Sequence, residues 1–363
     1  MTAPLMPLGS PCLPAGAAVA LTAMLSAFAP AQGQQPAIRG PNDVTFELLA
    51  SAPYGHLVQM EQTRRFLTPA GGFVDVRERV TVDGDGTRTS PFRLDYLGVV
   101  GVAPNSPEDQ KWAATYGKYA SLFYEHGSFR VHDATLAAAN YRIHTFGTTT
   151  IVGRTCWRGV VYPLRLDKSI WLVDLDSETG IPLHVAEFDS GARLIGELTV
   201  TRFAVAAQVQ RLGGNWAWSP RMRITPVDPQ ADTGSLFGPS VHVVSADTSR
   251  LMPDYSKLRS HVAENSFNGD RSLVDIYGDG IDEFFVVQTP GRPDPFASGP
   301  NALISTKTGA TKRPDTIAYY DDAALRVYEF HQHGVSFQIA GRGSLARLDQ
   351  FSRQVYKQAY AGR

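Results

Sequence analysis

Two acidic segments have residue types and spacing that could bind a metal ion. Residues 83–86 (DGDG) and residues 275–283 place carboxylate oxygens at short intervals, as calcium-binding loops do. Neither completes an EF-hand, because the first lacks the later acidic residue and the second has Gly278 at a ligand position. Tight turns between strands explain both segments more simply, so we predict turns rather than metal sites.

Histidine and cysteine give equally weak signals for chemistry. His331 and His333 could place two imidazoles on one strand face, but no third ligand is identifiable and Gly334 favours a turn. Cys156 has strand-like flanks, which are typical of a small buried side chain. The sequence contains neither G-x-S-x-G nor H-E-x-x-H. We therefore predict no catalytic residue, no metal and no cofactor.

An aromatic stripe is the strongest candidate for ligand binding. Trp112, Tyr116, Tyr119 and Phe123 follow one another at spacings of three and four, so they share one face of a helix. The helix is predicted over residues 107–125, with Ser and Pro at its start and acidic residues in its first turn. The stripe could line a cavity for an acyl chain, or it could be ordinary core packing.

Strands dominate the elements that must position this helix. Alternation of Val with charged residues predicts a half-buried strand over 74–82, and turn residues separate the strands that follow. In the first half we expect a short helix over 44–52 capped by Asn42, and strands over 87–100, 129–132, 141–146, 150–166, 169–174, 181–188 and 193–203. The last three should form an antiparallel meander.

A Pro- and Gly-rich stretch divides the chain. Residues 212–239 are predicted as the linker between a domain over 42–211 and a domain over 240–363. The second domain should contain strands over 241–245, 258–264, 272–277, 283–288, 316–320, 325–330 and 335–340, then a helix over 345–360 whose inner face includes Leu348 and Val355.

The N-terminus and the charge balance indicate where the chain works. Residues 1–31 contain no charged residue, and an apolar run over 15–28 precedes the small residues that signal peptidase accepts. We predict a signal peptide cleaved after Ala31, a flexible leader over 32–41, and a soluble periplasmic or secreted protein. A retained membrane anchor is the alternative, although the run is shorter than the roughly 20 residues of a span. The formal net charge of −1 gives no reason to expect nucleic-acid binding.

Two groups of motifs resemble the MucB/RseB family of periplasmic regulators, within the wider LolA-like lipoprotein-carrier group. The first group is IVGR at 151–154, YP at 162–163, IWL at 170–172, TGIPL at 179–183 and DSG at 189–191. The second group is YGDGI at 277–281 and FFVV at 284–287, followed by IAGR at 339–342 and the final helix. They occur in the order that the family shows, in both halves of the chain.

The resemblance implies a fold, a partner and a ligand. The fold is α+β and mainly antiparallel: a LolA-like open (half) β-barrel wrapped on helices, followed by a smaller α+β domain. Trp171 should face the core or the wall of an apolar cavity. The partner would be a lipid or lipoprotein acyl chain, and also the extracytoplasmic part of an anti-sigma factor.

Three functions therefore compete. The first is a non-catalytic binding protein that senses or carries acyl chains in envelope stress signalling. The second is a secreted hydrolase whose active site is assembled from loops. The third is a purely structural envelope protein.

Overall fold

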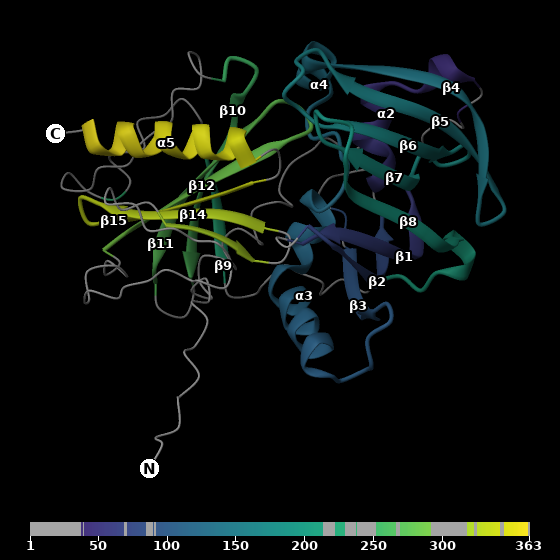
Figure 1. Cartoon of the computed structure of the whole chain (residues 1–363), viewed down its shortest axis with the longest axis horizontal. Coiled ribbons are helices and arrows are strands. Elements are labelled where there is room, and N and C mark those ends of the chain that lie inside the picture. Colours follow the sequence, from purple (N-terminus) through teal and green to yellow (C-terminus); the bar gives the residue numbers. More distant parts are fainter. Residues whose placement is uncertain are drawn as a thin grey trace.

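The chain folds into two antiparallel sheets that lie side by side in space (Figure 1). The computed structural model describes residues 38, 40–68, 71–84, 90, 92–212, 222–228, 237, 252–265, 269–291, 318–322, 325–341 and 345–361. The predicted signal peptide and the strand expected over 241–245 lie outside these residues. None of the described helices is both long enough and apolar enough to cross a membrane.

The first sheet has eight strands and is open. Its order is β3-β2-β1-β8-β7-β6-β5-β4, so among the described strands β3 and β4 are the edges and the sheet does not close into a barrel. The strands are β1 (Leu57–Leu67), β2 (Phe73–Asp83), β3 (Phe92–Val99), β4 (Tyr141–Ile151), β5 (Arg154–Pro163), β6 (Ile170–Asp176), β7 (Pro182–Phe188) and β8 (Leu194–Val205). The predicted meander is confirmed as β6-β7-β8.

Short helical segments accompany this sheet. They are η2 (Pro41–Asp43), α2 (Phe46–Ser51), η3 (Ala52–Tyr54), α3 (Pro107–His126), α4 (Ala134–Asn140) and η4 (Ala206–Gln208). Phe46 and Leu49 of α2 are buried in one core with strand residues of the sheet. The cap predicted at Asn42 is wrong, because the Thr45 hydroxyl accepts the N–H of Leu48 and Asn42 lies in η2.

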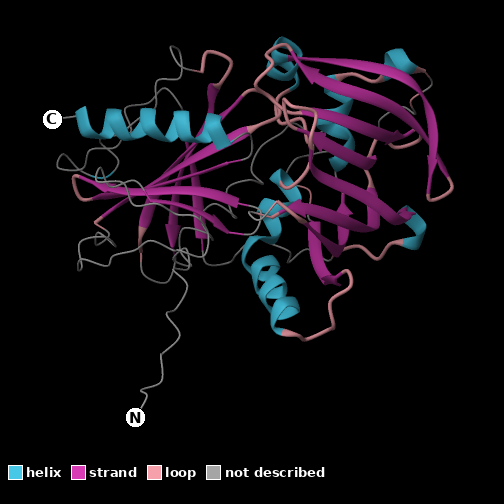
Figure 2. Cartoon of the chain, in the orientation of Figure 1, coloured by secondary structure: helices cyan, strands magenta, loops and turns pink. Residues whose placement is uncertain are grey.

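The second sheet has seven described strands and one covering helix, α5 (Leu345–Ala361). Its order is β13-β14-β15-β12-β11-β10-β9. The strands are β9 (Met222–Val227), β10 (Ser256–Asn265), β11 (Arg271–Gly278), β12 (Glu283–Pro290), β13 (Ala318–Asp322), β14 (Leu325–Gln332) and β15 (Val335–Gly341). Strands make up most of the described secondary structure in both halves (Figure 2), so the predicted α+β, mainly antiparallel fold with an open first sheet is confirmed.

Both faces of the second sheet are covered, which explains its unbroken apolar strands. Tyr277 and Phe284 face α5 and pack with Leu348, Phe351 and other residues of that helix. The neighbouring residues on each strand point the other way and pack against the first half of the chain. Strands buried on both faces are continuously hydrophobic, as FFVV at 284–287 is.

Three local predictions differ from the structure. Residues 129–132 are not a strand; they form a loop that leads into α4, a helix that the sequence did not indicate. The strand predicted over 150–166 is split by a turn, in which Val152 and Gly153 have φ of 43° and 77°. The segment predicted as linker contains β9, which pairs with β10 of the second sheet.

Candidate functional site

The structure places two of the predicted ligand-binding aromatics between the two sheets. Trp112 is 8% exposed and stacks on Phe66 of β1, with ring centroids 5.2 Å apart. Tyr116 is 2% exposed and donates its hydroxyl to Glu78 at 2.6 Å. Both pack with Val274, Ile276 and Phe285 among the residues of the second sheet. This face of α3 therefore fills the junction between the halves of the chain (Figure 1).

The remaining predicted site residues lie elsewhere. Trp171 is fully buried, as expected, with its ring centroid 5.7 Å from that of Phe129 and 5.6 Å from that of Tyr141. The helix positions of Tyr119 and Phe123 are confirmed, but their side chains lie outside what the structure describes. Acyl-chain contact by all five residues stays a prediction.

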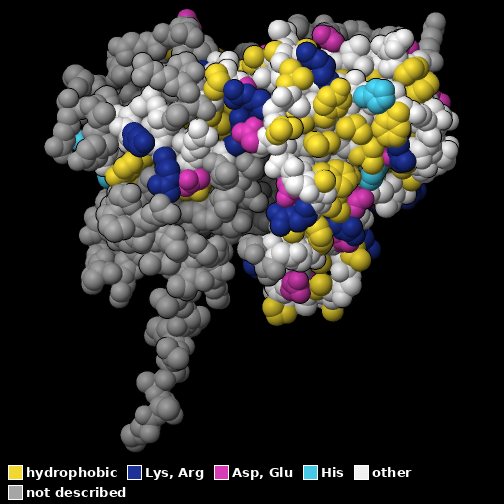
Figure 3. Space-filling view, turned by 45° about the horizontal axis from the view of Figure 1, so that its top comes forward, with side chains coloured by type: hydrophobic (Ala, Val, Ile, Leu, Met, Phe, Trp, Pro, Cys, Tyr) yellow, Lys and Arg dark blue, Asp and Glu magenta, His cyan; other side chains and the backbone are white. Residues whose placement is uncertain are grey.

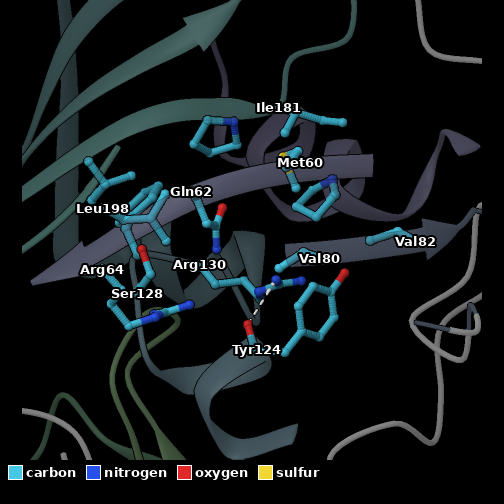
Figure 4. Close-up of a pocket in the computed structure, with 14 residues that line it drawn as sticks. Met60, Gln62, Arg64, Val80, Val82, Tyr124, Ser128, Arg130, Ile181 and Leu198 are labelled. Atoms are coloured by element: carbon cyan, nitrogen blue, oxygen red, sulfur yellow. Dashed lines mark hydrogen bonds between the residues drawn. The ribbon is translucent and has the colours of Figure 1, made fainter. Parts of the chain in front are cut away.

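A pocket opens instead under the concave face of the first sheet (Figure 4). Its walls come from β1, β2, β7 and β8, from η3, and from the end of α3 and the loop after it. It is lined by Pro53, Met60, Gln62, Arg64, Val80, Val82, Tyr124, Ser128, Phe129, Arg130, Ile181, Pro182, Val185 and Leu198. The wall is mostly apolar, with a few polar groups, which is the usual composition of a small-molecule site.

The size of the pocket limits what it can hold in this state. Its volume is about 60 Å³. That is several times the space one water needs, and well below the roughly 300 Å³ at which pockets enclose a drug-sized ligand. It has room for one small group or the end of a chain.

A buried polar network forms one side of the pocket. Glu78 is 0% exposed and accepts hydrogen bonds from Arg64, Gln62 and Tyr116. Burial, followed by the charge of Glu78, raises the pKa of the Tyr116 hydroxyl well above its usual value, so it remains a donor. The network links a pocket wall on β1 to α3 at the junction of the two sheets.

A second cluster of charges clamps the two halves together. Lys168, from the loop between β5 and β6, is buried and contacts Asp254 at 2.6 Å and Asp279 at 2.5 Å. The Tyr141 hydroxyl donates to Asp279 at 2.7 Å, and Arg347 of α5 contacts Asp254 at 2.9 Å. We call these five residues the interdomain clamp.

Backbone contacts complete the clamp at the turn between β11 and β12. The N–H groups of His132 and Asp133 donate to the carbonyl of Gly280, at 2.8 and 3.2 Å. Asp279 accepts the N–H groups of Ile281 and Asp282, which holds the turn in shape. The YGDGI motif is thus a turn, as predicted, and it docks against the first half of the chain.

Hydrophobic side chains also gather on the outer surface of the first half (Figure 3). Of the exposed large hydrophobic side chains among the described residues, five lie near β4 and β5: Phe146, Val152, Tyr162, Leu164 and Leu166. They lie on β4 and β5 and in the turns beside them, at the free edge of the sheet.

Cysteine chemistry and metal binding find no support among the described residues. Cys156 is buried, and burial, with the charges of Asp176 and Asp174, raises the pKa of its thiol to about 11. A thiol with such a pKa is a poor nucleophile near neutral pH. No group of three or more His, Cys, Asp or Glu among the described residues could hold a metal ion.

Comparisons with known proteins find likeness in structure only. No family model and no curated protein matches the chain. The crystal structure of MucB in complex with MucA(peri) is similar over 86% of this chain and 97% of that one, with 16% identity and a TM-score of 0.46. The Pseudomonas aeruginosa MucA/MucB complex is similar over 85% of this chain and 95% of that one, with 18% identity and a TM-score of 0.44.

A lipoprotein-sorting domain shows a weaker likeness. The putative outer membrane lipoprotein-sorting protein domain from Vibrio parahaemolyticus is similar over 47% of this chain and 96% of that one, with 11% identity and a TM-score of 0.20.

Proposed function

We propose that this chain is a non-catalytic, extracytoplasmic binding protein that senses or carries acyl chains and binds the extracytoplasmic part of an anti-sigma factor. The observation that carries the proposal is the pocket on the concave face of the first sheet, with apolar walls and a buried polar side. A core of native density has few voids larger than a water molecule, so a lined space of this kind favours a ligand over plain packing.

The size of the pocket defines how an acyl chain would use it. About 60 Å³ accepts one end of a chain, and the rest would extend past η3 and the loop after α3, which close the pocket. Neither η3 nor the loop after α3 is part of the sheet, so neither is fixed by the backbone hydrogen bonds that pair neighbouring strands.

A series of acyl chains tests ligand binding. Calorimetric titration of the purified protein with chains of 4 to 12 carbons should show affinity that rises about fourfold per methylene, because each buried methylene contributes about 0.8 kcal/mol. The rise should stop when the available wall is covered. No saturable binding across the series would overturn the ligand part of the proposal.

Two leucine variants separate the pocket from general stability. Leu198→Ala widens the pocket and should extend the preferred chain length. Leu273→Ala, in the buried core of the second sheet, should lower stability by about 2–5 kcal/mol and leave the length preference unchanged. An equal effect of both variants on the length preference would contradict this site.

The anti-sigma part of the proposal is supported by the motif resemblance in both halves of the chain. The test is co-expression with the extracytoplasmic segment of an anti-sigma factor encoded beside this gene. A stable complex on size exclusion is expected. Absence of a complex at micromolar concentrations, with acyl binding intact, would favour a carrier over a regulator.

A further inference from the structure

The apolar pocket contains a buried cation whose hydrogen bonds are incomplete. The Arg64 side chain is 3% exposed, and its Nε and Nη2 donate to Glu78 at 3.0 and 2.7 Å. Its Nη1 is buried and has no hydrogen-bond partner among the described residues. A buried donor on a charged group that lacks a partner destabilises the fold, so its persistence here suggests a role in binding.

Glu78 is already committed to other donors. Its two oxygens accept from Arg64, from the Gln62 amide and from the Tyr116 hydroxyl. A carboxylate offers about four acceptor positions, and these bonds use them. The remaining donor of Arg64 therefore needs an acceptor from outside this network.

Arg130 brings a second guanidinium to the same pocket. It lies 4.4 Å from the ring centroid of Tyr124 and 5.3 Å from that of Tyr54, and its Nη2 donates to the Tyr124 carbonyl at 3.0 Å. Stacking on two aromatic rings fixes the guanidinium plane. In Figure 4 the Gln62 amide and the Arg64 guanidinium lie beside the Arg130 side chain, whose own guanidinium extends toward the Tyr124 ring.

We propose that this pocket is an anion subsite that receives the carboxylate head of a fatty acid or a similar single-chain amphiphile. Arg64 Nη1 donates to the carboxylate, and the charge of Arg130 offsets the desolvation of the anion. The first methylenes lie against Met60, Val80 and Leu198. This inference rests on the proposed function, and it reverses the orientation expected of a chain buried tail first.

The shape of the pocket agrees with one small anion. About 60 Å³ accommodates a carboxylate and leaves no room for a branched head group. Burial and the charge of Arg130 act to lower the pKa of Arg64, whereas Glu78 raises it. The effect of Arg130 is expected where two guanidinium groups approach one another.

The test compares five ligands by calorimetric titration of the purified protein. They are dodecanoate, its methyl ester, dodecyl phosphate, acetate and inorganic phosphate. Dodecanoate should bind at least tenfold more tightly than the methyl ester, because a charge-assisted hydrogen bond contributes roughly 1.5–3 kcal/mol. Acetate and inorganic phosphate alone should bind much more weakly than dodecanoate.

Arginine variants locate the effect. Arg64→Lys keeps the charge beside Glu78 but removes Nη1, and Arg130→Met removes the second charge from a half-buried position. Each should reduce the preference for dodecanoate over the ester at least fivefold while the ester still binds. Arg65→Met, on the neighbouring residue of β1 paired with Asp75, is the matched control and should leave the preference unchanged.

Each outcome has one consequence. Equal binding of dodecanoate and ester overturns the anion subsite and leaves the acyl site standing. Loss of binding by both overturns the proposed ligand function itself. Tighter binding of dodecyl phosphate than dodecanoate, or binding of free anions as tight as dodecanoate, overturns the assignment to a fatty-acid carboxylate.

Discussion

Gly280 is in close backbone contact with the first half of the chain. Its φ is 105°, and a Cβ built there would overlap the backbone N of Ala137 and lie 2.6 Å from its Cα. Backbone atoms cannot move aside as a flexible side chain can. The glycine of the YGDGI motif is therefore required by contact with α4 as well as by the turn.

Gly280→Ala should destabilise the protein by more than the roughly 1 kcal/mol that a positive φ alone costs an alanine. Gly334→Ala is the control, because Gly334 has φ of 75° and nothing within 4 Å of its would-be Cβ. Chemical denaturation of both variants measures the difference. Equal losses of free energy of unfolding would show that the approach to α4 contributes nothing.

Two histidines should give the stability opposite dependences on pH. His184 is hydrogen-bonded to Asp174 at 2.9 Å and to Glu197 at 3.2 Å, and these bonds raise its pKa. Its stabilisation is fully present below pH 6.5 and is lost as pH rises through the raised pKa. Burial, with the charge of Arg259, lowers the pKa of His261 to about 4, so its contribution is present above pH 6.5 and is lost as pH falls toward 4.

His184→Gln should remove the decline in stability above pH 6.5, and His261→Gln should flatten the decline below it. The acid decline from His261 is on the order of 3 kcal/mol at pH 4. Urea unfolding at pH 4.5, 6 and 8 checks both variants. A parallel shift of the whole curve, with no change in its slope, would contradict the assignment.

At the scale of elements, α3 is attached by two tyrosine hydroxyls of different burial. Tyr116, on the helix, donates to buried Glu78, whereas Tyr96 of β3 donates at 2.6 Å to Asp109 in the first turn of the helix. A buried bond to a carboxylate contributes more than a partly exposed one, because loss of the donor leaves the acceptor short of partners.

Tyr116→Phe should therefore cost roughly 1.5–3 kcal/mol, and Tyr96→Phe about 1 kcal/mol or less. Hydrogen exchange of the amides of α3 measures where the loss occurs. Tyr116→Phe should increase exchange along the helix and in β11 and β12, which α3 covers. Exchange confined to the first turn in both variants would mean that Tyr116 does not hold the helix on the second sheet.

The sequence predicted elements well where the signal was local. Alternation of Val with charged residues located β2, and spacing along residues 345–360 gave the buried face of α5, including Leu348 and Val355. The loop over 129–132 was mistaken for a strand because the residue that it contacts, Gly280, is far away in the chain and leaves no mark on the local pattern. The turn at Val152 was missed because a β-branched residue with positive φ is no turn signal.

The candidate site was predictable only in part. The helical spacing of the aromatic residues was correctly predicted, but Trp112 and Tyr116 pack on the second sheet, and no local pattern indicates which surface a helix covers. The pocket is instead lined by Tyr124, next to Phe123 in the chain and about 100° around the helix from it. Arg64 lies at one position of the alternating pattern of β1, and a charged residue in a strand is usually expected to be exposed. The sequence therefore did not indicate that Arg64 is buried beside Glu78.

At the scale of the whole molecule, the interdomain clamp and the shared apolar cluster join two sheets that each have a core of their own. Within the clamp, Lys168 belongs to the first half and forms ion pairs with two carboxylates of the second half, Asp254 and Asp279. Burial alone would raise the pKa of Asp254, but its bond to Lys168 and the charges of Lys168 and Arg347 outweigh burial and lower it. The stability that this linkage supplies is present above about pH 4 and is lost as pH falls further.

Lys168→Met should uncouple the two halves. It leaves Asp254 and Asp279 buried without the ammonium group, and removing one partner of a buried ion pair costs about 3–5 kcal/mol. We expect one calorimetric unfolding transition for the wild type, because the cluster around Trp112 and Phe285 must open with both sheets, and two transitions for the variant. Lys257→Met is the control: Lys257 contacts buried Asp275 at 3.0 Å, and both belong to strands of the second sheet, so its loss should lower stability without splitting the transition. A single transition in Lys168→Met, lowered as in Lys257→Met, would mean that the apolar cluster alone couples the sheets.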